Sequence, residues 1–326
     1  MTISLSNPTI RAAVGRRDAW PILILVASTL LSGAGTLEAG DVFKSQSHET
    51  KTIAFNDDGS QLAYAGGKGI HIIETRSRKP VRSIKDLPGD ATTIVWIGDR
   101  IAATGGKYVG IWKASDGSVV KIHKQKTYTY NLVACRETGV IYAGQGTVTG
   151  WSLETGEVAM PEITLKEVSS LAVDPKGKRL YVCEKWGGSI KVFDARTGKP
   201  GGEIKTVSRA RQMLFLPQGK SMIVVRFAKP VVEMSAEGKV LRELGPRSSF
   251  GKMSSSKDGR YLLMPTWSTE REPEEVIVLD LKRRGKVKAV YKVVEGGIFD
   301  AKLSPDGKTL VAAPKDENLH FFQFKG

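Results

Sequence analysis

Short apolar segments and polar turns containing glycine alternate along most of the chain. One unit has an alternating apolar strand at 170–173, a polar turn, a second apolar strand at 180–183, a glycine-rich turn and a third strand at 190–193. Apolar and polar positions that alternate with a period of two, interrupted by such turns, are typical of half-buried β-strands rather than helices. The pattern therefore predicts an all-β protein built from short antiparallel strands.

The polar turns recur with a fixed period. The glycines of the first turn lie at 59, 139, 177, 219, 259 and 307, with a degenerate copy at Gly98-Asp99. A second series follows the third strand of the units, at 117, 156, 198, 238 and 285. Glycine is suited to these positions because tight hairpin turns need positive φ angles. A period of about 40 residues with several short strands per unit predicts a β-propeller.

Seven units can be counted, beginning near positions 51, 91, 130, 168, 211, 250 and 298. The seventh contains only three strands, and residues 42–44 (Val-Phe-Lys), ahead of the first unit, can supply its missing outer strand. Closing the ring in this way removes exposed sheet edges. We therefore predict one seven-bladed β-propeller over residues 41–326, closed by an N-terminal strand.

Two segments carry a resemblance to a known family. Residues 190–194 (Ile-Lys-Val-Phe-Asp) with Thr197-Gly198, and residues 303–308 (Leu-Ser-Pro-Asp-Gly-Lys), resemble the WD-repeat family and its bacterial YVTN-type relatives. The Trp-Asp pair that names the family is replaced by Trp112-Lys113 and Trp151-Ser152, and the Gly-His pair is absent. The resemblance, which spans residues 41–326, implies the fold and hardly any specific function, since propellers carry many functions.

Residues 1–39 differ from the rest of the chain. A segment with three arginines precedes an apolar run at 19–31, and small residues follow. This order is the layout of a secretory signal peptide, with cleavage after Ala34 or Ala39. The alternative is an uncleaved N-terminal membrane anchor, although the apolar run is shorter than the roughly 20 residues of a membrane span. We expect export to the bacterial periplasm or the extracellular space.

Motifs for catalysis or metal binding are not evident. The four histidines, at 48, 71, 123 and 320, lack metal-ligand spacing, and no zinc, haem or phosphate-binding motif is present. Four glutamates within 270–275 could bind calcium, although an arginine and a proline interrupt them. Cys135 and Cys183 fall in different units, so buried free thiols are expected. No catalytic residue, metal or cofactor is predicted.

Basic residues exceed acidic ones. The net charge is +15, of which the leader contributes +1 from three arginines, one aspartate and one glutamate. In a four-stranded blade, the first and third turns lie on one face of the ring. The third turns of units one and six are expected to form a basic face there: Arg76, Arg78, Lys79, Lys282, Arg283, Arg284 and Lys286. Such a face would bind an anionic polymer or an acidic partner, unless these residues serve only solubility.

The opposite face carries the second turns and the links between blades. Its predicted binding residues are Tyr108, Tyr130, Trp186, Arg209, Arg211, Arg226 and Trp267, accompanied by Tyr128 and Phe227. Aromatic residues and arginine dominate binding hot spots, so we expect a ligand or partner to dock here. The alternative is that these loop aromatics pack on neighbouring blades.

The leading functional prediction is a non-enzymatic binding scaffold outside the cytoplasm. A protein is the expected partner, an anionic polymer or the envelope surface is a second candidate, and intracellular nucleic acid is not expected. Membrane contact would require an uncleaved leader. The alternative is a propeller enzyme, lactonase-like by resemblance to the YVTN-type group, with a site at the central channel. Metal dependence and carboxylates converging on that channel would favour the enzyme.

Overall fold

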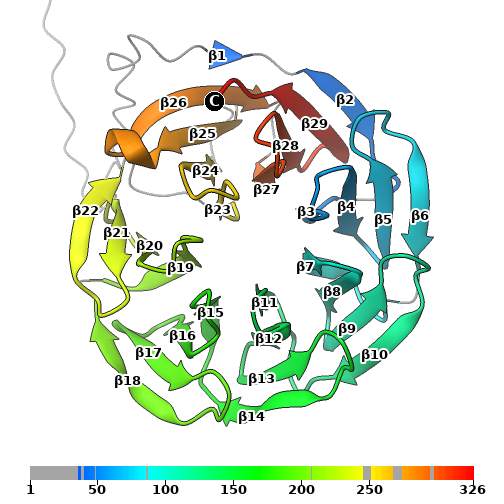
Figure 1. The fold of residues 1–326 in the computed structure, drawn as a ribbon. Coiled ribbons are helices and arrows are strands. Elements are labelled where there is room, and N and C mark those ends of the chain that lie inside the picture. Colours follow the sequence, from blue (N-terminus) through cyan, green and yellow to red (C-terminus); the bar gives the residue numbers. More distant parts are fainter. Residues whose placement is uncertain are drawn as a thin grey trace, which may run out of the picture. The chain divides into compact units, whose positions relative to one another are not determined.

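The repeats of the sequence form seven antiparallel sheets arranged as blades around a central axis (Figure 1). The computed structural model describes residues 36–37, 40–47, 49–85, 87–206, 208–244, 251–266, 274–293 and 297–326. The seven-bladed β-propeller predicted from the sequence is therefore confirmed. Nearly all of the predicted leader lies outside the described residues, so its cleavage and the export of the chain stay predictions. Within the described ranges, no helix has both the length and the apolar character needed to cross a membrane.

The first four blades follow the sequence units in order, from the innermost strand to the outermost. Blade one contains β3 (Thr52–Phe55), β4 (Gln61–Gly66), β5 (Gly69–Glu74) and β6 (Pro80–Ile84). Blade two contains β7 (Ala91–Ile97), β8 (Arg100–Gly105), β9 (Tyr108–Lys113) and β10 (Val119–Lys124). Blade three contains β11 (Asn131–Cys135), β12 (Val140–Gly144), β13 (Thr147–Ser152) and β14 (Val158–Thr164). Blade four contains β15 (Val168–Val173), β16 (Arg179–Glu184), β17 (Ser189–Asp194) and β18 (Pro200–Lys205).

Blade five again follows the sequence order, whereas blades six and seven each add a strand from the N-terminal part of the described chain. Blade five contains β19 (Ala210–Phe215), β20 (Ser221–Arg226), β21 (Val231–Ser235) and β22 (Val240–Leu244). Blade six contains β23 (Ser254–Ser255), β24 (Tyr261–Pro265), β25 (Glu274–Asp280) and β26 (Lys286–Val293), with the 3-10 helix η1 (Leu281–Arg283) between the last two and β1 (Thr36–Leu37) added in parallel to β26. Blade seven contains β27 (Ile298–Leu303), β28 (Thr309–Pro314), β29 (Asn318–Gln323) and, outermost, β2 (Asp41–Lys44).

An N-terminal strand closes the ring, as predicted. Strand β2 pairs antiparallel with β29, with Val42 opposite His320 and Phe43 opposite Leu319. The Phe43 ring packs edge-on against Tyr64 of blade one at 6.1 Å between centroids. The two ends of the propeller are therefore joined by backbone pairing and by apolar packing, which leaves no open junction between its first and last blades.

The repeated turns owe their shape to side chains that bond the local backbone. In the third turn of blade four, Asp194 Oδ1 accepts hydrogen bonds from the backbone N and the hydroxyl of Thr197 (2.7 and 2.8 Å), and Gly198 has a φ of 68°. In the first turn of blade seven, Ser304 Oγ accepts from Thr309 N at 2.9 Å, and Gly307 has a φ of 70°. These contacts explain physically why the sequence repeats Asp, Ser or Thr beside glycine.

The apolar core lies between neighbouring blades. Trp112 and Trp151 are part of this core and are 0% and 3% exposed. Both cysteines are free and buried, as predicted, and burial raises the pKa of the Cys183 thiol. Buried thiols act as small apolar side chains.

A belt of hydrogen bonds joins every inner strand to the next. Each inner strand has one free edge, and a buried edge N–H or C=O without a partner would destabilise the fold. At every junction a polar side chain bonds the backbone of the next blade. The seven bonds join Thr52 to Ile94 N, Thr93 to Tyr130 O, Asn131 to Val168 O, Ser170 to Met213 N, Gln212 to Met253 N, Ser254 to Ala301 O, and Asp300 to Ile53 N, at 2.6–3.1 Å.

One lysine spans the centre of the ring. Lys252, next to β23, pairs through its backbone with Asp300, and its Nζ donates to Thr92 O and, at 3.0 Å, to Thr93 Oγ1 of blade two. Burial lowers the pKa of Lys252 to about 8; Asp300 opposes that shift and Lys302 adds to it. Blades six and two are separated by two blades, so this side chain ties together distant parts of the propeller.

The lowered pKa of Lys252 predicts a contribution to stability that rises with pH in the alkaline range. Between pH 8 and the ordinary lysine pKa of 10.5, the unfolded chain keeps a proton that the folded chain has lost. The free energy of unfolding should therefore rise by at most about 1.4 kcal/mol per pH unit from this group. Urea unfolding across that range should show a more positive slope of unfolding free energy against pH in the wild type than in Lys252→Met, in which the other titrating groups are the same. Equal slopes in the two proteins would contradict the assignment.

Candidate functional site

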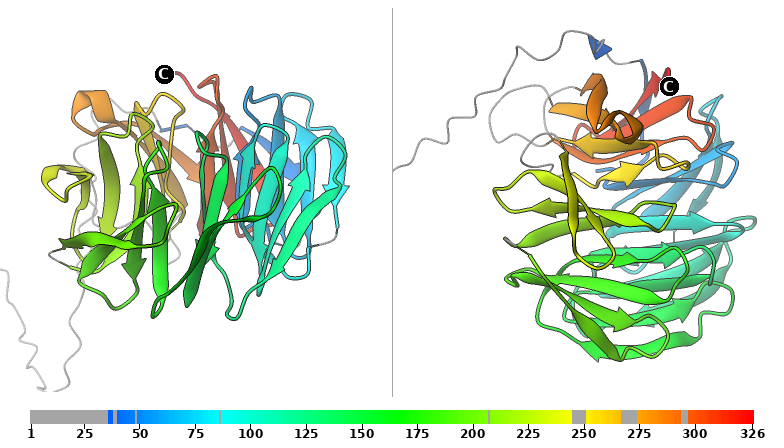
Figure 2. Two further views of the ribbon diagram at one scale, coloured as in Figure 1. Left: turned by 60° about the horizontal axis from the view of Figure 1, so that its bottom comes forward. Right: turned by 60° about the vertical axis from the view of Figure 1, so that its left-hand side comes forward.

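The exposed aromatic side chains gather on one face of the propeller. Seen from the side, the strands run between two faces (Figure 2), and we call the one with the second turns and inter-blade links the link face. Tyr128, Tyr130, Trp186 and Phe227 lie on it, with exposed fractions of 55%, 49%, 69% and 46%. The other large exposed hydrophobic residues in the described part of the chain are aliphatic and lie on outer strands: Val42, Val81, Val119, Val158, Val240, Leu241 and Val287. The link face is therefore distinguished by exposed rings.

Two of these rings form a cluster with one arginine. Trp186 lies in the second turn of blade four, Phe227 in the second turn of blade five, and Arg209 in the link between those blades. The guanidinium carbon of Arg209 lies over both rings, 4.9 Å from the Trp186 centroid and 4.6 Å from that of Phe227. Cation–π contacts of this kind stabilise both partners. We call these three residues the Trp186 cluster.

Hydrogen bonds to backbone carbonyls hold the link between blades four and five to both of the turns that carry the rings. The hydroxyl of Thr206 donates to Gly188 O in the turn of blade four at 2.8 Å. The backbone N of Phe227 donates to Arg209 O at 2.8 Å, and Ala228 turns the chain with a φ of 52°. The three cluster side chains therefore project from a bonded frame, which reduces the ordering needed when a partner docks.

A second aromatic pair occupies the link between blades two and three. The rings of Tyr128 and Tyr130 stack at 6.2 Å between centroids with an interplanar angle of 12°. The ammonium of Lys107 lies 5.7 Å from the Tyr128 centroid. The carbonyl of Tyr130 accepts the belt bond from Thr93 Oγ1. Blade three separates this pair from the Trp186 cluster, so the link face carries two aromatic centres.

The remaining residues predicted for this face differ in their surroundings. Arg211 is exposed, with its guanidinium carbon 5.5 Å from the Phe227 centroid, and Tyr108 is half-buried at the start of β9. Arg226, by contrast, is only 6% exposed, and its guanidinium donates to Pro230 O at 3.2 Å. It supports the turn that carries Phe227 instead of facing solvent. Trp267 lies outside the described residues.

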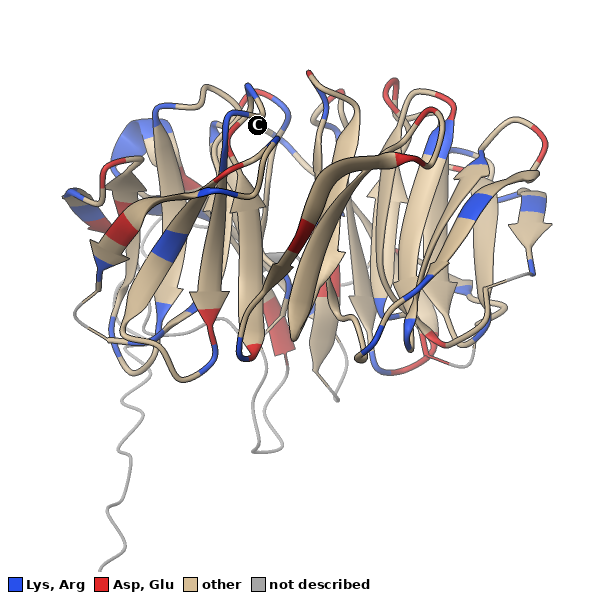
Figure 3. Cartoon of the chain, turned by 90° about the horizontal axis from the view of Figure 1, so that it is seen from below, with Lys and Arg blue, Asp and Glu red and all other residues tan. Residues whose placement is uncertain are grey.

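The opposite face carries the first and third turns of the blades, and we call it the first-turn face. It carries charges of both signs. Basic and acidic segments alternate along the rim that bears the C-terminus (Figure 3). Arg78 lies over the Phe321 ring at 3.7 Å and 3.8 Å from the Asp41 carboxylate. Asp280 accepts hydrogen bonds from the backbone N of Lys282 and Arg283 and lies 3.0 Å from Arg260. Carboxylates from the same turns therefore offset part of the positive charge predicted for this face. Arg76, Lys79, Lys282, Arg283, Arg284 and Lys286 are exposed there.

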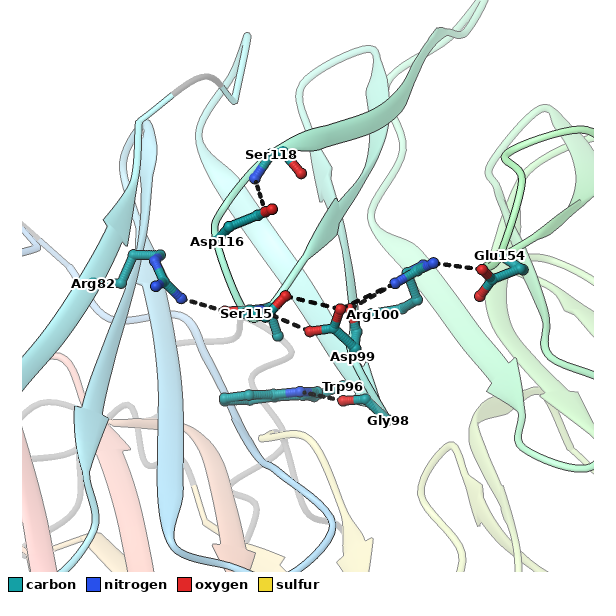
Figure 4. A network of polar contacts seen from close by, with 10 residues as sticks. Arg82, Trp96, Gly98, Asp99, Arg100, Ser115, Asp116, Ser118 and Glu154 are labelled. Atoms are coloured by element: carbon teal, nitrogen blue, oxygen red, sulfur yellow. Dashed lines mark hydrogen bonds and ion pairs between the residues drawn. The ribbon is translucent and has the colours of Figure 1, made fainter.

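A network of turn residues links the first three blades on this face (Figure 4). Asp99 accepts hydrogen bonds from the backbone N and hydroxyl of Ser115, at 2.7 and 2.9 Å, and Arg100 pairs with Glu154 of blade three at 2.6 Å. Arg82 of blade one donates to Ala114 O at 2.5 Å. A surface hollow of about 480 Å³ lies beside it, lined partly by Asp57 and Asp99. These two carboxylates already bond side chains of the protein, so they fit a structural role.

Side chains also cross the mouth of the central channel on the first-turn face. Asp57 of blade one accepts two hydrogen bonds from Arg136 of blade three, at 2.6 and 2.7 Å, and its carbonyl accepts one from Lys257 of blade six. The hydrogen-bonded Arg136 guanidinium holds the pKa of Asp57 below its usual value. Lys252, by contrast, crosses the ring nearer the link face, because it and its partners Thr92 and Thr93 stand at the link ends of the inner strands.

The described histidines and acidic residues do not assemble a metal site. Nowhere in the described ranges do three or more His, Cys, Asp or Glu side chains come together closely enough to hold a metal ion. His71 and His123 stack on Tyr64 and Trp151, and the ring of the buried His320 bonds Asp316. His48 and the segment 267–273 with two of the four clustered glutamates lie outside the described residues. The converging carboxylates that would favour the enzyme are not found among the described residues.

Comparison with known proteins adds no family assignment. No protein-family model matches the chain, and no curated protein matches it at a significant level. The chain is therefore identified by its architecture, a seven-bladed β-propeller compatible with a binding scaffold.

Proposed function

We propose that the chain is an exported, non-enzymatic scaffold that docks a protein partner through the link face, centred on the Trp186 cluster. The observation that carries the proposal is that all four of the large exposed aromatic rings in the described part of the chain lie on that face. Residues 190–194 and 303–308 make a divergent WD-repeat or YVTN-type propeller the best family proposal, and the leader-like residues 1–39 support export.

The chemistry of the cluster suits a protein surface. Tryptophan and arginine are enriched in hot spots because they offer a large contact area together with hydrogen-bond donors. The rings project from turns held by a rigid sheet, an arrangement common in binding proteins. The aliphatic side chains on the outer strands are spread over different blades and offer no comparable centre.

Replacing Trp186 and Phe227 together by alanine is expected to reduce partner capture at least about tenfold. Each ring is a hot-spot candidate, and loss of one hot spot typically costs about 2 kcal/mol or more of binding free energy. The test is a pull-down from envelope extract of the host, at low and high salt, with the full chain as the host processes it. Since both rings are largely exposed, the fold should survive the substitutions.

The matched control removes exposed apolar surface elsewhere. Val158→Ala with Leu241→Ala acts on two outer strands and should leave capture unchanged. Capture of a protein that is lost equally with both pairs of substitutions would contradict the proposal. Recovery of salt-sensitive anionic polymer alone, reduced by Arg76→Ala with Arg283→Ala, would assign binding to the first-turn face instead.

A further inference from the structure

The Trp186 cluster holds an arginine whose hydrogen-bond donors are not used within the described structure. The Arg209 side chain is half-buried, and its guanidinium lies over the rings of Trp186 and Phe227. No hydrogen bond or ion pair from this guanidinium to another described residue is present, whereas Arg226 nearby bonds Pro230 O. The N–H donors of Arg209 therefore stay available to a ligand, while its guanidinium carbon lies beside two aromatic rings.

A guanidinium with unused donors is suited to a carboxylate. Its N–H groups form a planar fork that matches the two oxygens of a carboxylate, and such paired contacts are stronger than neutral hydrogen bonds. The two rings limit the orientations of the fork before any ligand arrives, so little conformational freedom is lost on binding. Arg209 is therefore positioned to recognise an anionic group that approaches the link face.

The surrounding charge favours the same ligand chemistry. The segments that build the cluster, 185–186, 209–211 and 227–229, contain four basic residues and no acidic ones. Lys185 pairs with Glu167 at 2.8 Å, so a carboxylate from a neighbouring segment offsets part of this positive charge. The potential at the cluster should therefore attract negative charge.

The arrangement of the rings distinguishes a peptide from a nucleic acid. Bases bind by stacking on open ring faces. Here cationic groups already lie over both rings: Arg209 and Lys185 over Trp186, and Arg209 and Arg211 over Phe227. The ring surface that stays exposed is suited to aliphatic side chains. We propose that the Trp186 cluster binds an acidic peptide segment of a partner protein, with a carboxylate on Arg209 and neighbouring aliphatic side chains on the rings. This inference rests on the proposed function and narrows it.

The test is selection of a displayed library of random decapeptides on the full chain, as processed by its host, in the wild type and in Arg209→Lys. The wild type should select peptides enriched in Asp and Glu beside aliphatic residues. Arg209→Lys keeps the charge but removes the planar fork, so it should lose that enrichment and bind the selected peptides about tenfold more weakly. Arg76→Lys on the first-turn face is the matched control and should behave as the wild type.

Every other result overturns the inference. These results are selection without acidic enrichment, no selection at all, equal binding by Arg209→Lys, or tighter binding of a single-stranded oligonucleotide than of the selected peptides. Thermal unfolding of both variants shows whether a loss reflects the site or the fold. If the envelope partner is still captured, is sensitive to Trp186→Ala with Phe227→Ala, and is insensitive to Arg209→Lys, the proposed function stands and the acidic ligand is excluded.

Discussion

Asp300→Ala should destabilise the propeller by about 3 kcal/mol or more, which corresponds to a fall of roughly 6–12 °C in the unfolding midpoint. The Asp300 carboxylate is 1% exposed, accepts from Ile53 N at 3.1 Å and pairs with Lys302 Nζ at 2.7 Å. Its removal breaks the belt between blades seven and one. It also leaves Lys302 and the nearby Lys252 without their compensating charge, and an unpaired buried charge is costly.

Urea unfolding measures this loss directly. Asp300→Asn keeps an oxygen that can accept from Ile53 N but lacks the charge, so it should fall between the wild type and Asp300→Ala. Glu154→Ala removes a carboxylate that is 75% exposed and should cost less than about 1 kcal/mol. A loss in Asp300→Ala no larger than in Glu154→Ala would show that the belt and its buried charges do not stabilise the ring.

Removing the closing strand β2 should destabilise the propeller by a similar free energy. A chain that begins at Gln46 lacks β2, and therefore lacks the four backbone pairs with β29 and the packing of Phe43 on blade one. Loss of a large apolar side chain from a packed site typically costs about 3–5 kcal/mol, and the exposed edge of β29 adds a site for aggregation. We expect a fall of roughly 6–20 °C in the unfolding midpoint.

The comparison is with a chain that begins at Gly40, which keeps β2 and omits residues 1–39, the predicted leader. Circular dichroism gives the midpoints, and light scattering at rising concentration reports association through the open edge. Phe43→Ala in the longer chain separates packing from pairing and should show an intermediate midpoint. Indistinguishable midpoints for the chains beginning at Gly40 and Gln46 would contradict a closing role for β2.

The fold could be predicted because its turns leave a local chemical signature. Gly198 and Gly307 have positive φ angles, which favour glycine, and the residues beside them bond the local backbone. Each turn can therefore be recognised from a few neighbouring residues, and the recurrence of these turns reveals the repeat. The closing strand could be inferred because blade seven lacks a fourth strand and 42–44 fit that role. Burial of both cysteines followed from their apolar strand context. Each of these features depends on short stretches of sequence.

The belt was missed, although its signal is present in the sequence. Thr52, Thr93, Ser170 and Asp300 recur as polar residues in otherwise apolar first strands. Their role depends on which backbone atoms of the next blade lie free, and that is a property of the closed ring. Lys252 was missed for the same reason, since its partners in blade two lie 160 and 159 residues away in sequence.

The sequence predicted which face of the propeller carries the candidate site, but it did not predict the contacts between the residues of that site. Alternating turns place Trp186, Arg209 and Phe227 on the same side, but their stacking depends on how blades four and five approach each other. Arg226 was counted as a surface residue because it borders a turn, and the structure buries it. On the other face, positive residues were counted without the carboxylates that accompany them, such as Asp280.

The most direct test of the binding face is photo-crosslinking in the host cell. A photo-reactive amino acid is placed at Gly188 in the turn of Trp186, at Val158 on an outer strand, or at Arg76 on the first-turn face; Gly188 is exposed and a side chain added there meets no other atom within 4 Å. We expect a discrete crosslinked protein adduct from position 188 and none from positions 158 and 76. Adducts from position 76 or 158, with none from 188, would contradict the link face as the surface that docks the partner.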